Sequence, residues 1–192
     1  MATKLLVLNN RGLSVDSLVA ALRGAGATVD LVEPEAFVGA IPAGLYDGVV
    51  ASGGYLRAAS RAATLGRYSE LFRDLDRPYL GVCLGMKVLG FCYGARIGNV
   101  GPVVGTRRVS LDGFPLCPGL SEFAVHQNHR YELLRPLPPS LRDYTSSGPT
   151  QAVKVADRDL YAVQFHPEVG SSPARVIMEN FVSLCAGRPQ RH

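Results

Sequence analysis

Apolar residues along the first half of the chain fall into two alternating patterns, one typical of buried strands and one typical of amphipathic helices. The predicted strands are short apolar runs at residues 5–8, 28–32, 46–51 and 79–82. The predicted helices carry apolar side chains at helical spacing, at residues 15–22 and 65–75 and again after residue 84. Buried strands that alternate with helices imply an α/β fold with a mostly parallel, doubly wound sheet, flanking helices and right-handed crossovers.

The pattern changes after about Gly94, where shorter predicted strands are separated by turns. These strands are expected at residues 103–111, 122–127, 151–156 and 160–165. This half looks largely antiparallel, so we expect a smaller antiparallel sheet beside the main one. A last amphipathic helix is predicted over residues 173–185. Because no repeat, linker or low-complexity segment divides the chain, we expect a single domain over residues 1–192.

Composition and charge are those of an ordinary globular protein and argue against two classes of partner. Hydrophobic residues make up 47% of the chain and charged residues 19%. The 20 basic and 16 acidic residues give a net charge of +4, scattered rather than striped, which offers no support for nucleic-acid binding. No apolar stretch approaches the roughly 20 residues that cross a bilayer, so we expect no membrane partner.

The four cysteines differ in their surroundings. They form no Cys-x-x-Cys pair and no dense framework, and the chain starts directly with a strand and no signal peptide, so a reducing cytoplasm fits best. Cys92 falls within a predicted helix, and Cys117 and Cys185 lack a matching base, so we expect these three to pack in the core. Cys83 is the exception.

Cys83 follows an apolar run and stands in the frame Gly81-x-Cys83-x-Gly85, before a helical pattern. Glycines let a strand and a helix approach closely around a strained turn that presents a nucleophile. Only the thiolate attacks, and an imidazolium or a helix N-terminus can lower the pKa of a thiol well below its free value of about 8.5. The frame predicts a cysteine-nucleophile enzyme; the alternative is an inert buried cysteine.

A base and a carboxylate follow far downstream, at His166 and Glu168. Pro167 restricts the residue before it to an extended backbone and so fixes where the imidazole points. A carboxylate that hydrogen-bonds one ring nitrogen holds the tautomer in which the other nitrogen serves the thiol. Alone, this segment could be a surface His-Pro turn, but together with Cys83 it predicts a Cys83, His166 and Glu168 triad.

Gly53 and Gly54 end the third predicted strand, just as Cys83 ends the fourth. Ligands collect outside the carboxyl ends of the strands in such sheets, so these residues are expected on one rim. The glycines could form a simple turn. Alternatively, a glycine N–H could stabilise a developing oxyanion together with the N–H of Leu84.

His126 and His129 have the spacing of a metal-binding pair on a helix. Their neighbours at residues 123–125 look more like a strand that enters a loop, and no third ligand is suitably spaced. We therefore expect no metal and no cofactor.

The Gly81-x-Cys83-x-Gly85 frame and residues 165–168, with the base 83 positions after the nucleophile, resemble the class I glutamine amidotransferases over nearly the whole chain. The resemblance implies a flavodoxin-like architecture and hydrolysis of the glutamine side-chain amide through a Cys83 thioester. It also implies delivery of ammonia to a synthase. Because the chain ends soon after its last predicted helix, we expect the synthase as a separate chain, and two-chain GMP synthases match best in length and layout.

The chain departs from the family pattern in the residues implied to recognise the substrate. Family members usually continue Cys-Leu-Gly-x-Gln, whereas Lys87 here is a cationic donor without an acceptor. A second segment, often Glu-Tyr-Gly, aligns with residues 103–105, where only Gly105 is kept. The resemblance further implies that His129, in a loop, lies beside the active site or at a partner interface. It also implies that Gln164 borders the substrate pocket.

Lys87 lies one helical turn after Cys83 and therefore on the same helix face. Its ammonium could attract a substrate carboxylate or hold Cys83 as thiolate, or it could be an ordinary solvated lysine. Three functions stay open. The chain could be one subunit of a glutamine amidotransferase. It could also be a related cysteine hydrolase acting on another γ-glutamyl or amide substrate, or a catalytically silent regulatory homologue.

Overall fold

The computed structural model describes residues 2–33, 36, 41, 44–55, 61–170 and 173–187. Its strands are β1 Lys4–Leu8, β2 Thr28–Val32, β3 Gly48–Ala51, β4 Tyr79–Val82, β5 Arg96–Ser110, β6 Glu122–Leu134, β7 Leu141–Asp143, β8 Ala152–Val155 and β9 Leu160–Val163. Its helices are α1 Val15–Gly24, α2 Arg61–Asp74, α3 Leu84–Cys92, the 3₁₀ helix η2 Pro173–Arg175 and α4 Val176–Ala186. None of the helices in these ranges is long and apolar enough to cross a membrane.

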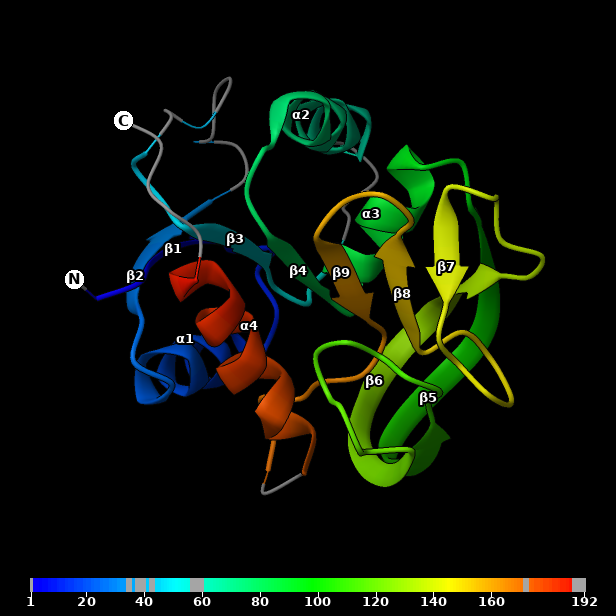
Figure 1. Cartoon of the computed structure of the whole chain (residues 1–192). Coiled ribbons are helices and arrows are strands. Elements are labelled where there is room, and N and C mark those ends of the chain that lie inside the picture. The colour runs from blue at the N-terminus through cyan, green and yellow to red at the C-terminus, as the bar shows by residue number, and fades with distance from the viewer. Residues whose placement is uncertain are drawn as a thin grey trace.

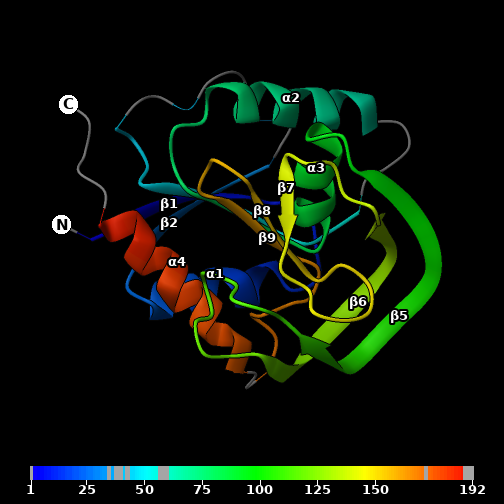
Figure 2. The ribbon, with the colours of Figure 1, turned by 45° about the vertical axis from the view of Figure 1, so that its right-hand side comes forward.

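Seven strands form one sheet in the order β2-β1-β3-β4-β9-β8-β7 (Figure 1). Pairing is parallel from β2 through β1, β3 and β4 to β9, as expected for a doubly wound α/β sheet. Helices α1 and α4 cover one face, and α2 and α3 cover the other (Figure 2). The expected α/β fold with flanking helices is confirmed.

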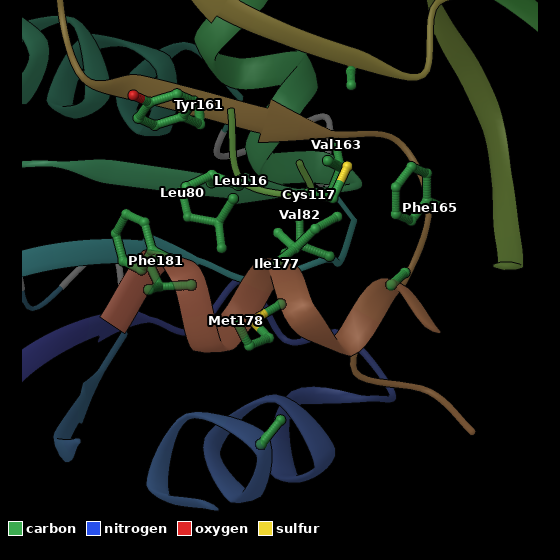
Figure 3. Close-up of a cluster of buried hydrophobic side chains, with 14 of the residues drawn as sticks. Leu80, Val82, Leu116, Cys117, Tyr161, Val163, Phe165, Ile177, Met178 and Phe181 are labelled. Atoms are coloured by element: carbon green, nitrogen blue, oxygen red, sulfur yellow. The ribbon is translucent and has the colours of Figure 1, made fainter. Parts of the chain in front are cut away.

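Strand β4 is buried on both faces, because its apolar residues alternate between the two cores. Leu80 and Val82 face α4, where Phe181 lies among their neighbours (Figure 3). Tyr79 faces the opposite side and packs edge-on against Phe72 of α2, with ring centroids 4.9 Å apart. This packing on both sides fixes the carboxyl end of β4, where Cys83 follows.

The second half is less antiparallel than its sequence suggested. Strand β9 lies inside the main sheet and runs parallel to β4, and all of its residues are buried, as is usual for a central parallel strand. Strands β8 and β7 then extend the same sheet in antiparallel fashion. The expected smaller antiparallel sheet is present as the ribbon formed by β5 and β6.

The β5–β6 ribbon is longer than predicted, because β6 continues well beyond Gln127. His126 and His129 therefore lie within a strand, and the loop expected at His129 is wrong. The alternation of buried positions persists through this polar stretch, with Gln127 and His129 at buried positions and Asn128 between them less buried. Residues three apart on a strand point to opposite faces, so the two histidines lack the arrangement of a helical metal-binding pair.

Candidate active site

Cys83 occupies a strained turn between β4 and α3. Its φ is 51°, a value that non-glycine residues rarely adopt. A Cβ added to Gly81 would lie 2.6 Å from the backbone of Gly85, and one added to Gly85 would lie 2.6 Å from the carbonyl oxygen of Ala51. Because only glycines permit such close approach, the glycine frame lets β4, α3 and β3 meet around the carboxyl end of the strand and present the thiol there.

His166 and Glu168 reach Cys83 from the segment that follows β9. The Nδ1 of His166 lies 2.8 Å from Oε1 of Glu168, and the imidazole also hydrogen-bonds with Cys83. The backbone N–H of His166 donates to the carbonyl oxygen of His126, 2.9 Å away, which ties this segment to β6. All three triad candidates are buried, and the structure places them side by side.

The charges of this group favour a thiolate paired with an imidazolium. Burial by itself raises the pKa of Cys83, but the hydrogen bond with His166 and the charge of Lys87 outweigh it, so the pKa lies below the ordinary thiol value. Burial by itself lowers the pKa of His166, but hydrogen bonds with Cys83 and Glu168 raise it to about 10. A larger fraction of the Cys83 thiol is therefore in its nucleophilic thiolate form than for an ordinary cysteine at the same pH.

The pKa values of the other three cysteines are shifted in the opposite direction from that of Cys83. Burial raises the pKa of Cys117 to about 11, and it raises the pKa of Cys92 and Cys185 as well. A raised pKa keeps a thiol protonated and unreactive. These cysteines have the surroundings of packing residues, as we expected from their sequence context.

Gly53 lies directly against the Cys83 and His166 pair. A Cβ added to Gly53 would lie 2.7 Å from Cε1 of His166 and 3.5 Å from the Cβ of Cys83. Gly54 instead packs on the loop after β1, where an added Cβ would lie 1.8 Å from the carbonyl oxygen of Asn10. Glycine is therefore required at both positions, and Gly53 is the one that borders the thiol.

The backbone segments that carry the expected oxyanion donors are held firmly. Leu84 is the first residue of α3, and the first N–H groups of a helix have no partner within it. The loop after β3 is fixed by Asn10, whose backbone N–H donates to Ser52 Oγ at 2.9 Å and whose side chain accepts from the Tyr68 hydroxyl at 2.9 Å. Sequence analysis missed Asn10 and Ser52, although both follow the carboxyl ends of predicted strands.

Lys87 is buried beside the thiol, so its interpretation as a solvated lysine is wrong. Its Nζ lies 3.6 Å from Cys83 Sγ, and only 6% of the residue is exposed. With the amide of Gln164 turned so that its oxygen faces Lys87, that oxygen accepts from Nζ at 3.0 Å and from Nδ1 of His129 at 3.3 Å. His129 Nε2 in turn lies 3.0 Å from Oε1 of Glu132. Lys87, Gln164 and His129 thus form one buried polar cluster at the thiol.

Strand β6, rather than Gly105 on β5, borders the thiol. The carbonyl oxygen of Asn128 lies 3.7 Å from Cys83 Sγ, and Asn128 pairs with Val104 across the ribbon. Gly105 pairs with Gln127 and has a φ of 97°, which explains why glycine is suited to this position. A role of Gly105 in substrate recognition stays a prediction.

Comparison with known proteins identifies the family. The family model described as glutamine amidotransferase class-I matches residues 6–184. Similar proteins, each named as a glutamine-hydrolysing GMP synthase subunit, occur in Natronomonas pharaonis, at 32% identity over 96% of this chain and 99% of that protein, and in Halobacterium salinarum, at 34% identity over 95% and 99%. The chain belongs to the class I glutamine amidotransferase family.

Solved structures agree with this assignment. A crystal structure described as a GMP synthase subunit of Thermoplasma acidophilum matches with a TM-score of 0.84 and 28% identity over 97% of this chain and 95% of that chain. A Thermotoga maritima glutamine amidotransferase has the same fold, with a TM-score of 0.72, at 19% identity. The expected class I amidotransferase architecture is thus confirmed.

Proposed function

We propose that this chain is the glutaminase subunit of a two-chain synthase and that it hydrolyses the side-chain amide of glutamine. The observation that carries the proposal is Cys83, held at a positive-φ turn and hydrogen-bonded to His166, which is itself 2.8 Å from Glu168. A nucleophile, a base and an orienting carboxylate in this arrangement suit acyl transfer through a thioester. This constellation also argues against a catalytically silent homologue.

The reaction follows from the positions of these groups. The Cys83 thiolate attacks the amide carbon, and the backbone N–H of Gly53 or Gly54, together with that of Leu84, stabilises the oxyanion that develops. His166 gives its proton to the leaving nitrogen, the C–N bond breaks, and ammonia departs from a γ-glutamyl thioester. A water molecule then attacks the thioester while His166 accepts its proton, and glutamate and the free thiol are released.

Glu168 orients His166 and takes no proton itself in this scheme. The hydrogen bond to Nδ1 keeps the other ring nitrogen toward the thiol and favours the imidazolium, as the raised pKa of His166 indicates. Glu168→Gln should therefore reduce kcat less than His166→Ala, because the amide can still hold the ring while losing the charge.

We further propose that the ammonia passes to a synthase subunit supplied as a separate chain and that this synthase makes GMP. The support is that relatives covering nearly the whole chain are named as GMP synthase subunits. In this proposal residues 1–192 act as one amidotransferase domain in the cytoplasm, a setting that agrees with four free cysteines.

A second candidate function is hydrolysis of a different γ-glutamyl or amide substrate. It is favoured by Lys87, which stands where the family usually has a substrate-binding glutamine and whose Nζ contacts the thiol. A lysine cannot accept a hydrogen bond, so it cannot reproduce the paired contacts of an amide.

Labelling with a glutamine-analogue electrophile tests the proposal. The wild-type protein should release ammonia from glutamine and should be labelled at Cys83, as located by mass spectrometry of peptides. Cys83→Ala should abolish both turnover and labelling, whereas the matched control Cys92→Ala should retain both. Labelling at another cysteine with activity intact would show that the site is wrongly assigned. Ready turnover of a different amide with none of glutamine would favour the second candidate.

A further inference from the structure

Ser14 contacts the candidate triad through its side chain, although no motif in the sequence indicated it. Its Oγ donates a hydrogen bond to Oε1 of Glu168 at 2.7 Å and lies 3.1 Å from Nδ1 of His166. We propose that Ser14 is a positioning residue that aims the Glu168 carboxylate at His166. This inference rests on the function proposed above, because it assigns Ser14 a part in the same reaction.

The hydroxyl of Ser14 is not used by its own helix. Ser14 is the N-cap residue of α1, where a serine oxygen ordinarily accepts a hydrogen bond from an N–H of the first turn. Its side chain makes no such capping hydrogen bond, and it instead reaches a carboxylate 154 residues further along the chain. Loss of the hydroxyl therefore removes a contact to the candidate site but no capping hydrogen bond.

The packing of the loop after β1 brings Ser14 to this place. Arg11 forms an isolated antiparallel bridge with Gly54, and a Cβ added to Gly12 would lie 2.5 Å from the carbonyl oxygen of Gly53. The loop thus lies directly on the segment that borders Cys83. Ser14 lies two residues after Gly12, and its side chain therefore reaches Glu168 at the rim of the site.

The contacts of Glu168 explain what the hydroxyl does there. Oε1 is shared by Ser14 and His166, while Oε2 is buried and has no hydrogen-bond partner among the residues that the structure describes. With its proton donated to Oε1, the Ser14 oxygen can also face the Nδ1–H of His166. Both contacts keep the ring proton on Nδ1, which leaves the other ring nitrogen for the thiol.

Substitution of the hydroxyl tests the proposal. Ser14→Ala should lower kcat for glutamine hydrolysis about tenfold with little change in KM, since it removes one hydrogen bond to a charged group. Ser14→Thr keeps the hydroxyl and should restore most of kcat. Ser17→Ala, an exposed serine of the same helix, is the matched control and should leave kcat unchanged. All three variants should melt close to the wild-type temperature.

A double-mutant cycle separates positioning from an independent effect. If Ser14 acts through Glu168, adding Ser14→Ala to Glu168→Gln should change kcat less than twofold. The proposal would be overturned if the fold-loss in kcat of the double mutant equalled the product of the two single losses. A Ser14→Ala variant with full kcat would overturn it too. A fall in kcat that merely tracks a lower melting temperature, and that Ser14→Thr does not rescue, would overturn it as well.

An NMR measurement that needs no turnover distinguishes failure of this proposal from failure of the proposed function. In protein labelled with ¹⁵N-histidine, the Nδ1 proton of His166 should shift and exchange faster with water in Ser14→Ala but not in Ser17→Ala. An unchanged Nδ1 proton in Ser14→Ala would reject the role of Ser14. Failure of the wild-type protein to hydrolyse glutamine would reject the proposed substrate, while the Nδ1 signal would still decide whether Ser14 orients the pair.

Discussion

Lys87 Nζ lies 3.6 Å from Cys83 Sγ, inside the protein and one helical turn beyond Cys83. Burial lowers the pKa of Lys87, while the charge of Cys83 and its hydrogen bond oppose that effect. Lys87 in turn lowers the pKa of Cys83. The ammonium and the thiolate therefore stabilise each other, at a position where the family usually offers an amide to its substrate.

We expect Lys87→Gln to separate the effect of the ammonium on the thiolate from the effect of an amide on substrate binding. Without the ammonium the pKa of Cys83 should rise, and at a pH below that pKa the alkylation of the thiol should slow by up to about tenfold for each unit of pKa. The restored amide should nevertheless raise kcat/KM for glutamine if glutamine is the substrate. Rates of iodoacetamide labelling and of ammonia release measure the two quantities.

Lys87→Met is the matched control, because it is similar in length but offers neither charge nor amide. It should slow alkylation as Lys87→Gln does, without the gain on glutamine. A fall in kcat/KM for glutamine in both variants would mean that the ammonium itself serves catalysis. Unchanged alkylation in both would contradict the stabilisation of the thiolate by Lys87.

The activity should follow a broad pH profile bounded by Cys83 and His166. The pKa of Cys83 is lowered, so its thiolate should be lost only at a pH below the range in which an ordinary cysteine titrates. The pKa of His166 is raised to about 10, so its proton should be available to the leaving ammonia until the pH rises through that value. Because the two groups interact, the apparent pKa values read from the two limbs describe the Cys83 and His166 pair rather than either residue alone.

Measurement of kcat/KM from pH 5 to 11 checks this expectation. Glu168→Gln removes a charge that raises the pKa of His166, so the alkaline limb should move to lower pH in that variant. Thiol alkylation that simply follows an ordinary cysteine titration near pH 8.5 would contradict the ion pair.

The first half of the fold could be predicted because each element there has a clean local pattern. Continuous apolar runs such as residues 79–82 are typical of strands buried on both faces, and the helices between them carry one apolar stripe. The ribbon was harder, because β6 places the polar Gln127 and His129 at buried positions, where local hydropathy suggests a loop. The length of β6 depends on its pairing with β5, and the sequence of neither strand alone specifies that pairing.

The candidate site was predictable where backbone constraints select the residue type. Gly81, Gly85 and Gly53 are required by close approaches that exclude a Cβ, so their spacing is visible in the sequence. Ser14 was missed for the opposite reason. A serine before a helix is an ordinary N-cap, and its contact with Glu168 exists only because the loop after β1 packs across the rim.

Gly53→Ala should damage activity far more than stability. The added methyl group would lie 2.7 Å from Cε1 of His166 and would push the ring away from Cys83. Because misplacement of a catalytic group by about 1 Å can reduce the rate about a hundredfold, we expect kcat to fall by that order. Gly66→Ala in α2 is the matched control, since an added Cβ there meets nothing within 4 Å and should add about 0.5–1 kcal/mol of stability. Equal activity of the two variants would contradict the placement of Gly53 at the thiol.

The isolated chain should hydrolyse glutamine slowly, and a synthase subunit that consumes ammonia should raise the rate. Two large apolar side chains are exposed on the loops that form the rim of the site: Leu13, next to Ser14, is 87% exposed, and Tyr55, next to Gly54, is 70% exposed. A partner that covers them would contact the loops that border Cys83 and could complete the substrate site.

Ammonia release should therefore rise at least about tenfold when the synthase subunit is titrated in, a size typical of coupling between sites. Leu13→Ser and Tyr55→Ser should weaken this activation and leave the basal rate of the isolated chain unchanged. Leu45→Ser is the matched control, because Leu45 is also exposed but precedes β3, at the opposite end of the sheet. A lone chain that already reaches full turnover would reject the coupling, and equal effects of Leu45→Ser and Tyr55→Ser would show that the partner does not dock on this rim.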